Sequence, residues 1–377
     1  MLPGSYIPAG SCWALPVRRQ NAYATLSSRL GSVPYIQVSP CFAILCGELS
    51  DWRVQTRMRL AGLALTLVLV SHQLLLGWGA EGHRAIAALA QTLITPDTLG
   101  KVRQLLNEGN ERDLVSASTW ADEIRPNARF DRPRPQDADA FNHQFPDNAS
   151  WHFIDLPLGT ASFTQARRFV TGKSDVVDAI ERCISVLESP MPIPGEVSRP
   201  DALRLLVHFV GDIHQPLHCG TGFYRITETG PPVLVVDPDA AAGLPNDRGG
   251  NDLFYGPKDQ LHAHWDLDLV QQVADTFDFR VLASYLGHEA QRLSWPETPG
   301  DYHHWPEAWA LESVRAANLA YEGIRFNAVE TMDGANTLWI AISLPADYDE
   351  KSRVLAAHQL TKAGARLAQL LDRIQWP

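Results

Sequence analysis

The sequence predicts an all-α protein, built as a single mainly helical domain. Apolar residues recur at helical spacing in almost every segment after residue 77. The chain has 377 residues and 45% hydrophobic content, which is enough for one large packed core. No internal repeat, low-complexity tract or linker divides the part after residue 77, so one domain is expected there.

Helical periodicity marks most of that domain. The expected helices cover residues 83–94, a proline-started segment from 96, 174–188, 201–213, 259–274, 279–293, 306–324 and 349–374. Two segments interrupt the pattern. Residues 126–150 are rich in Asp, Pro and Asn, and in residues 220–256 the stretch VLVV lies between Gly and Pro clusters. The second segment predicts a small β-hairpin inside a long loop, and loops of this length usually carry function.

The first 77 residues differ from the rest in charge and composition. They carry six arginines against two acids, a net charge of +4, so that the remainder carries −15 of the total of −11. Residues 60–70 form an unbroken small and aliphatic run behind Met58 and Arg59, which is typical of a secretory signal peptide. An uncleaved anchor is the alternative, since an extended run over 60–76 has 17 residues.

We therefore expect residues 1–57 to be an extension from a start codon assigned too early, 58–77 to be the signal peptide, and 78–377 to be the functional domain. Cleavage near Gly77 and Trp78 would make the protein secreted or periplasmic. Two cysteines remain in the domain, Cys183 and Cys219, and either one disulfide or two buried free thiols fits an exported protein.

The negative charge of the domain excludes a basic surface that holds nucleic acid by phosphate neutralisation alone. A polyanionic ligand would need local cations, and metal ions can supply them. The segment HFVGDIHQPLH places His208 and Asp212 four residues apart, on one face of a helix, before Pro216 ends the helix and His218 follows. Alone, such a pair is most simply a polar helix face.

The same arrangement recurs, which favours a metal site over a polar helix face. LHAHWD contains His262 and Asp266, again four residues apart, while WADEIR supplies Asp122 and WHFID supplies His152. Imidazoles and carboxylates without cysteine are the ligands of catalytic rather than structural zinc sites.

The motifs W-G-x-x-G-H, W-A-D-x-x-R, W-H-F-I-D, H-F-x-G-D-x-H-Q-P-L-H, G-G-N-D and L-H-x-x-W-D follow one another between residues 78 and 266. This order resembles the zinc-dependent single-strand nucleases of fungi, plants and bacteria, the nuclease S1 and nuclease P1 type. The resemblance implies the mainly helical fold shared with zinc phospholipase C, and a trinuclear zinc cluster. By matched positions, the first zinc would be held by Asp122, His152, His208 and Asp212, the second by His218, His262 and Asp266, and the third by Trp78, His83 and Asp212.

The resemblance also implies other roles. Arg125 would stabilise charge on the phosphate in the transition state, Asp155 would orient it, and Asp122 belongs to the same catalytic group. Phe153 would stack on a base and Asn251 would lie near the substrate. His214 and Trp265, inside the ligand motifs, are interpreted as supporting or packing residues, and five histidines without a partner pattern are assigned to surface or core: His143, His288, His303, His304 and His358.

The function implied is hydrolysis of single-stranded DNA and RNA to 5′-phosphate products, with activity on 3′-nucleotides, at three Zn²⁺ ions. A zinc phospholipase C is the alternative, disfavoured by the short interval from Trp78 to His83 and by Asp266, where the lipases carry Glu. An inactive zinc-binding protein is disfavoured by Arg125 and Asp155 beside a full ligand set. Since only an N-terminal Trp78 offers a free amine beside its carbonyl oxygen, cleavage after Gly77 is expected to complete the third zinc site.

Overall fold

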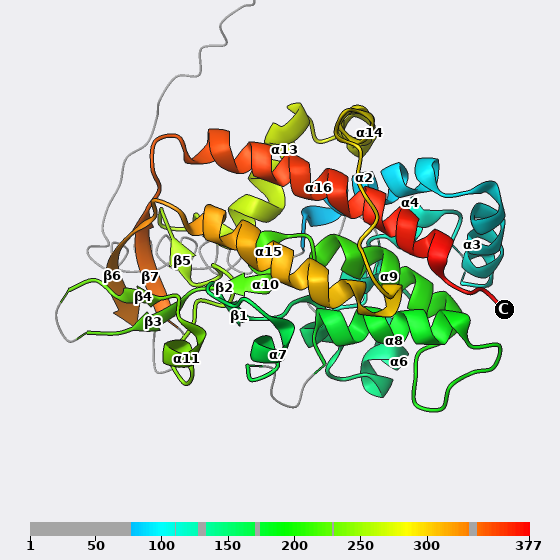
Figure 1. Cartoon of the computed structure of the whole chain (residues 1–377), viewed down its shortest axis with the longest axis horizontal. Coiled ribbons are helices and arrows are strands. Elements are labelled where there is room, and N and C mark those ends of the chain that lie inside the picture. Colours follow the sequence, from blue (N-terminus) through cyan, green and yellow to red (C-terminus); the bar gives the residue numbers. More distant parts are fainter. Residues whose placement is uncertain (1–76, 110, 127–132, 170–173, 228–229, 332–337) are drawn as a thin grey trace, which may run out of the picture. The chain divides into compact units, whose positions relative to one another are not determined.

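The computed structural model describes residues 77–109, 111–126, 133–169, 174–227, 230–331 and 338–377. The predicted extension and all of the predicted signal peptide except Gly77 lie outside these residues. The described part is mainly helical, as the sequence predicts (Figure 1). Within it, no helix combines the length and apolar composition that crossing a membrane requires.

Each predicted helical segment is confirmed. The helices are α2 (Gly79–Leu93), α3 (Pro96–Glu108), α4 (Leu114–Ala117), α5 (Trp120–Glu123), α6 (Ala138–Gln144), η1 (Asn148–His152), α7 (Phe163–Ala166), α8 (Val176–Glu188), α9 (Arg199–Asp212), α10 (Pro216–Cys219), α11 (Pro238–Ala241), α12 (Leu261–Ala263), η2 (His264–Asp268), α13 (Leu269–Ala274), α14 (Phe279–Leu293), η3 (Tyr302–His304), α15 (Trp305–Tyr321) and α16 (Tyr348–Arg373). Segment 126–150, expected as a loop, contains the short helix α6.

Several of the longer helices begin at polar caps that their sequences provide. The side chains of Thr95, Asp175 and Ser198 accept hydrogen bonds from backbone amides in the first turns of α3, α8 and α9. Pro96 and Pro200 stand at the start of α3 and α9, where a missing N–H costs nothing.

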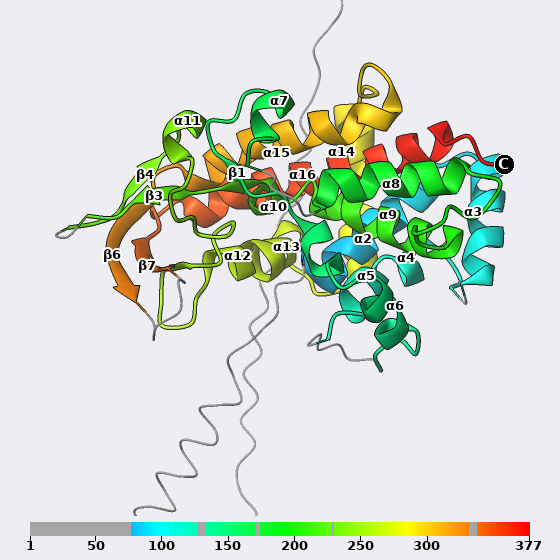
Figure 2. The same cartoon turned by 90° about the horizontal axis from the view of Figure 1, so that it is seen from below.

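Helix α9 is the central helix of the domain. All its residues from Ala202 to Asp212 are buried, as expected for a helix surrounded by others. It packs against α2, α3, α4, α5, α8 and α16 (Figures 1 and 2). Its last residue, Asp212, therefore lies deep in the protein.

Short strands complete the fold. β1 (Leu156–Pro157) pairs in parallel with β2 (Gly220–Thr221), and β3 (Phe223–Arg225) forms an antiparallel hairpin with β4 (Val233–Val235), which confirms the predicted hairpin. A three-stranded sheet of β5 (Leu253–Phe254), β7 (Leu338–Ser343) and β6 (Arg325–Thr331) was not predicted. In β7, Ile340 and Ile342 alternate with less buried neighbours, a strand pattern too short to stand out between two long helices.

The two cysteines are not paired. Cys183 on α8 and Cys219 at the end of α10 are both free and buried, which is the second of the two alternatives that the sequence leaves open. Each side chain is enclosed in the apolar core, where burial raises the pKa of Cys183 to about 12. Both thiols stay protonated and unreactive at neutral pH.

Candidate metal centre

The C-terminal end of α9 carries the centre of the site. His208 and Asp212 lie one helical turn apart and are fully buried, with His208 Nε2 3.1 Å from Asp212 Oδ2. The C-terminus of a helix carries partial negative charge, to which the Asp212 carboxylate adds. This end of α9 therefore favours cations.

Two further elements bring side chains to the same carboxylate. His152, at the end of η1, places Nδ1 2.9 Å from Asp212 Oδ2. Asp122, on α5, has Oδ2 3.6 Å from His208 Nε2. The ring of His208 is fixed from behind, because its Nδ1 lies 2.7 Å from the carbonyl oxygen of Ser118. The predicted group of Asp122, His152, His208 and Asp212 is thus brought together.

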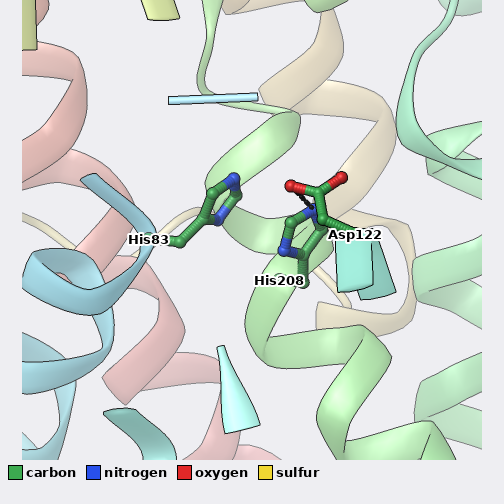
Figure 3. A group of neighbouring side chains, drawn as sticks. All are labelled: His83, Asp122 and His208. Atoms are coloured by element: carbon green, nitrogen blue, oxygen red, sulfur yellow. Dashed lines mark ion pairs between the residues drawn. The ribbon is translucent and has the colours of Figure 1, made fainter. Parts of the chain in front are cut away.

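Helix α2 adds His83 to this group (Figure 3). Its ring stacks on that of His208, with centroids 3.9 Å apart, and His83 Nε2 is 3.4 Å from Asp212 Oδ1. Asp212 therefore has His83 on one oxygen and His152 and His208 on the other, as a bridging ligand would.

A second group forms beside the first. His218, His262 and Asp266 each place a ligand atom within 4.8 Å of the other two. His262 Nε2 is 3.3 Å from Asp266 Oδ2, across a single π-helical turn at 264–268, a feature often found at functional sites. His218 also reaches Asp212, with Nδ1 3.5 Å from Oδ1, which links the two groups.

Hydrogen bonds from outside the groups orient these ligands. His262 Nδ1 is 2.6 Å from the carbonyl oxygen of Gly249, and Gln215 donates to Asp266 Oδ1 at 2.8 Å. Gln215 and Gly249 lie inside the sequence motifs, but spacing alone gives neither of them a role. His214 is buried, with its Nδ1 2.7 Å from the carbonyl oxygen of Val210 and its Nε2 3.2 Å from Arg366 Nη1, so its ring contacts α9 and α16.

Burial and charge shift the pKa values of these groups in opposite directions. Burial lowers the pKa of His152 to about 4 and that of His262 to about 3. Burial also acts to lower the pKa of His208, but Asp212 and Asp122 outweigh it and raise the pKa to about 9. Burial raises the pKa of Asp266 well above its usual range. The charges of Asp212 and Asp122 thus favour the protonated form of His208, and burial favours the protonated form of Asp266.

Buried polar atoms test whether cations fit this site. Four side chains in the centre have buried atoms without a hydrogen-bond partner among the described residues: both ring nitrogens of His83, His208 Nε2, Asp212 Oδ1 and Asp266 Oδ2. Leaving such atoms unpaired costs free energy, which metal coordination would recover. Imidazole nitrogens and carboxylate oxygens are ligands that zinc accepts, so the residues fit this metal.

Gly77 and Trp78 reach the same place from the start of α2. The Trp78 ring is fully buried, and its Nε1 donates to the carbonyl oxygen of Gly211 at 3.0 Å. A Cβ on residue 77 would lie 1.9 Å from Asp212 Oδ1 and 2.9 Å from His218 Cε1. A larger residue at position 77 would displace the side chains of Asp212 and His218, because the backbone of Gly77 lies directly beside the Asp212 carboxylate.

The remaining predicted residues surround the centre. Arg125 follows α5, with Nη1 3.4 Å from Asp122 Oδ1. Phe153 follows His152 and is 38% exposed. Asn251 is buried, with Nδ2 3.2 Å from His262 Nδ1.

The expected pairing of Asp155 with Arg125 is absent from the described residues. Asp155 instead accepts a hydrogen bond from Thr221 at 2.8 Å. Burial raises the pKa of Asp155, while the Thr221 hydrogen bond and the positive charge of Arg248 act to lower it. The strand pair β1–β2 brings Thr221 beside the residues that follow η1, and Asp155 thereby finds its hydrogen-bond donor.

Comparison with known proteins decides the family. The sequence model of the S1/P1 nuclease family matches residues 78–375. The chain belongs to the S1/P1 nuclease family.

Among its relatives, nuclease S1 of Aspergillus oryzae is 24% identical over 317 residues, covering 82% of this chain and 96% of the relative. Endonuclease 3 of Arabidopsis thaliana is 26% identical, covering 81% and 93% of the two chains. Nuclease P1 of Penicillium citrinum is 25% identical, covering 79% and 97%. The protein is therefore a nuclease, a hydrolase of phosphodiester bonds.

Proposed function

We propose that this S1/P1 nuclease is an exported endonuclease that uses three zinc ions to hydrolyse single-stranded DNA and RNA. Its products would be 5′-phosphates, and it would also act on 3′-nucleotides. The observation that carries the proposal is the set of unpartnered buried nitrogen and oxygen atoms at the end of α9. The family membership and the nuclease names of the relatives support the substrate class.

The residues would hold the ions in three sets, of which the first and the third share Asp212. Asp122, His152, His208 and Asp212 form the first set, His218, His262 and Asp266 the second, and Trp78, His83 and Asp212 the third. His152 and His262 have lowered pKa values and so are neutral at neutral pH, as metal ligation requires. Zinc ions in such a centre activate water and offset the charge of a phosphodiester.

Other side chains would act on the substrate directly. Arg125 lies at the edge of the centre, its side chain 16% exposed beside Asp122, where its guanidinium can stabilise the developing charge on a bound phosphate. The exposed ring of Phe153 directly follows a proposed ligand, His152, and offers a stacking surface for the neighbouring base. A base stacked on Phe153 has to leave its partner strand, which favours single strands.

The same geometry supports the processing proposal. Cleavage after Gly77 would remove the residue that lies against Asp212 and would create the amine of Trp78 at that position. We expect a chain that retains its leader to bind two zinc ions well and the third poorly, with reduced activity. Metal analysis of leader-retaining and Trp78-started chains tests this, and equal zinc content and activity would contradict it.

The decisive assay compares two phosphodiester substrates. The zinc-loaded chain is expected to release 5′-phosphate products from single-stranded DNA and RNA and to leave phosphatidylcholine vesicles intact. Hydrolysis of vesicles alone would establish the phospholipase C alternative. Complete zinc loading without hydrolysis of either substrate would establish the inactive zinc-binding protein.

A further inference from the structure

A second group of metal-binding side chains lies where α8, η3 and α15 meet, and it shares no residue with the catalytic centre. Glu181 is on α8, His304 ends η3, and Glu307 is in the first turn of α15. One ligand atom from each side chain lies within 4.8 Å of the other two. His304 Nδ1 is 3.8 Å from Glu307 Oε1.

An unpartnered oxygen distinguishes this group from ordinary surface acids. Glu181 Oε1 is buried and has no hydrogen-bond partner in the part of the chain that the structure describes. Burial raises the pKa of Glu181 to about 7, and the negative charge of Glu307 acts in the same direction. A divalent cation between the two carboxylates would remove the repulsion and give the buried oxygen a partner.

A neighbouring arginine does not already fill this role. The charge of Arg167 acts on Glu181, but its Nη1 donates to Asp178 Oδ1 at 2.8 Å. Glu181 Oε1 keeps no hydrogen bond in spite of this nearby cation.

We propose that Glu181, His304 and Glu307 bind one zinc ion, or a similar divalent transition-metal ion, at a site separate from the catalytic centre. One imidazole and two carboxylates form a ligand set for such ions, whereas Ca²⁺ and Mg²⁺ take oxygen ligands. The His304 side chain is 70% exposed, so the remaining coordination position faces water. The bound ion would connect α8 to the start of α15 and thereby stabilise their packing.

Zinc analysis of three full chains tests the site: the unmodified protein, His304→Ala, and His288→Ala as the matched control. His288 is an exposed histidine on α14 whose Nδ1 contacts the carbonyl oxygen of Ser284, in its own helix. After loading with zinc and removal of excess metal, we expect His304→Ala to contain about one zinc ion per chain less than the other two proteins. All three should hydrolyse single-stranded DNA at the same rate.

Equal zinc content in the unmodified chain and His304→Ala would overturn the site. A second variant, Glu181→Gln, keeps the side-chain shape and removes one ligand charge. Added zinc should raise the midpoint of thermal unfolding of the His288→Ala control more than that of Glu181→Gln. Equal rises would also refute the site. Both measurements compare chains with intact catalytic ligands, so neither depends on the proposed activity.

Discussion

Two buried carboxylates, Asp212 and Asp247, differ in how their charge is compensated by the surrounding protein. Both are completely buried. The carboxylate of Asp247 accepts hydrogen bonds from the hydroxyls of Tyr224 and Tyr321, at 2.6 and 2.9 Å, and from the amides of Gly222 and Gly250, at 3.2 and 3.0 Å. Asp212 faces four histidine rings, and its Oδ1 has no hydrogen-bond partner among the described residues.

The difference indicates what each region is built for. Around Asp247, protein donors satisfy the carboxylate, and the result is a structural anchor for the loop that carries Gly249, whose carbonyl oxygen orients His262. Gly249 has a φ of +63°, and a Cβ there would lie 2.0 Å from the carbonyl oxygen of Leu217, so the loop approaches α10 closely only with glycine. Around Asp212, several buried nitrogen and oxygen atoms have no hydrogen-bond partner among the described residues, which supports the proposed cations.

Matched substitutions at the two carboxylates should give the largest contrast. We expect Asp212→Asn to lose zinc and to reduce single-stranded DNA hydrolysis about 1,000-fold or more, because bound metals contribute several kcal/mol to catalysis. Asp247→Asn should keep its zinc and hydrolyse DNA at a rate within about 10-fold of the unmodified chain. A loss of about 10-fold is the smallest usually caused by replacing a residue that supports a metal ligand. Metal analysis and initial rates measure both effects, and zinc retention in folded Asp212→Asn would break the comparison.

Chelation should lower stability through the loss of bound zinc ions and not through Asp247. Removing zinc that was present at about 1,000 times its dissociation constant should lower the free energy of unfolding by about 4 kcal/mol for each site emptied. Asp247→Asn should lose the same amount, since its carboxamide lies outside the ligand sets. Denaturant unfolding with and without chelator measures this. A chelator that leaves stability unchanged would mean that the buried atoms around Asp212 need no cation.

The pH dependence of stability should report on Asp247. Burial raises its pKa from 3.8 to about 7, although four hydrogen bonds act against the shift. Because the folded pKa exceeds the unfolded value, the contribution of protonated Asp247 is fully present below pH 3.8 and is lost as the pH rises through about 7. The unmodified chain should therefore lose more stability over this interval than Asp247→Asn, when both are unfolded by denaturant after chelation. Parallel pH profiles would show that Asp247 does not titrate in this range.

The smallest effect is expected from removing a single donor at Asp247. Tyr321→Phe deletes one hydroxyl and should lower the free energy of unfolding by about 1 to 3 kcal/mol, since a buried acceptor loses one of several donors. Zinc content and the rate of DNA hydrolysis should stay unchanged. Thermal unfolding and metal analysis check this result, and a loss of zinc would mean that the two regions are not independent.

Local sequence patterns predicted the parts of the site that lie within one helix. The four-residue spacing of His208 and Asp212, and of His262 and Asp266, puts each pair on one helix face, as the structure confirms. That these pairs meet, together with His83 and His152, depends on packing over long sequence distances. Periodicity carries no information on such packing, and the expectation came from the family resemblance.

Contacts set by packing account for what the sequence analysis missed. The pairing of Asp155 with Thr221 depends on the short strand pair β1–β2. The strands β6 and β7 were not predicted, because they are short and lie in the sequence between two long helices. His304 was assigned to surface or core because Glu181 lies far from it in the chain, so no local motif joins them. In each case the partner residue comes from a different element.

Anomalous diffraction at the zinc edge, on crystals of the chain that begins at Trp78, tests the central claim most directly. The account predicts three anomalous peaks at the end of α9, each about 2.0 to 2.2 Å from the nitrogen and oxygen atoms of its proposed ligands. A zinc-supplemented crystal without peaks among His83, Asp212 and Asp266, with these side chains hydrogen-bonded to one another, would contradict it.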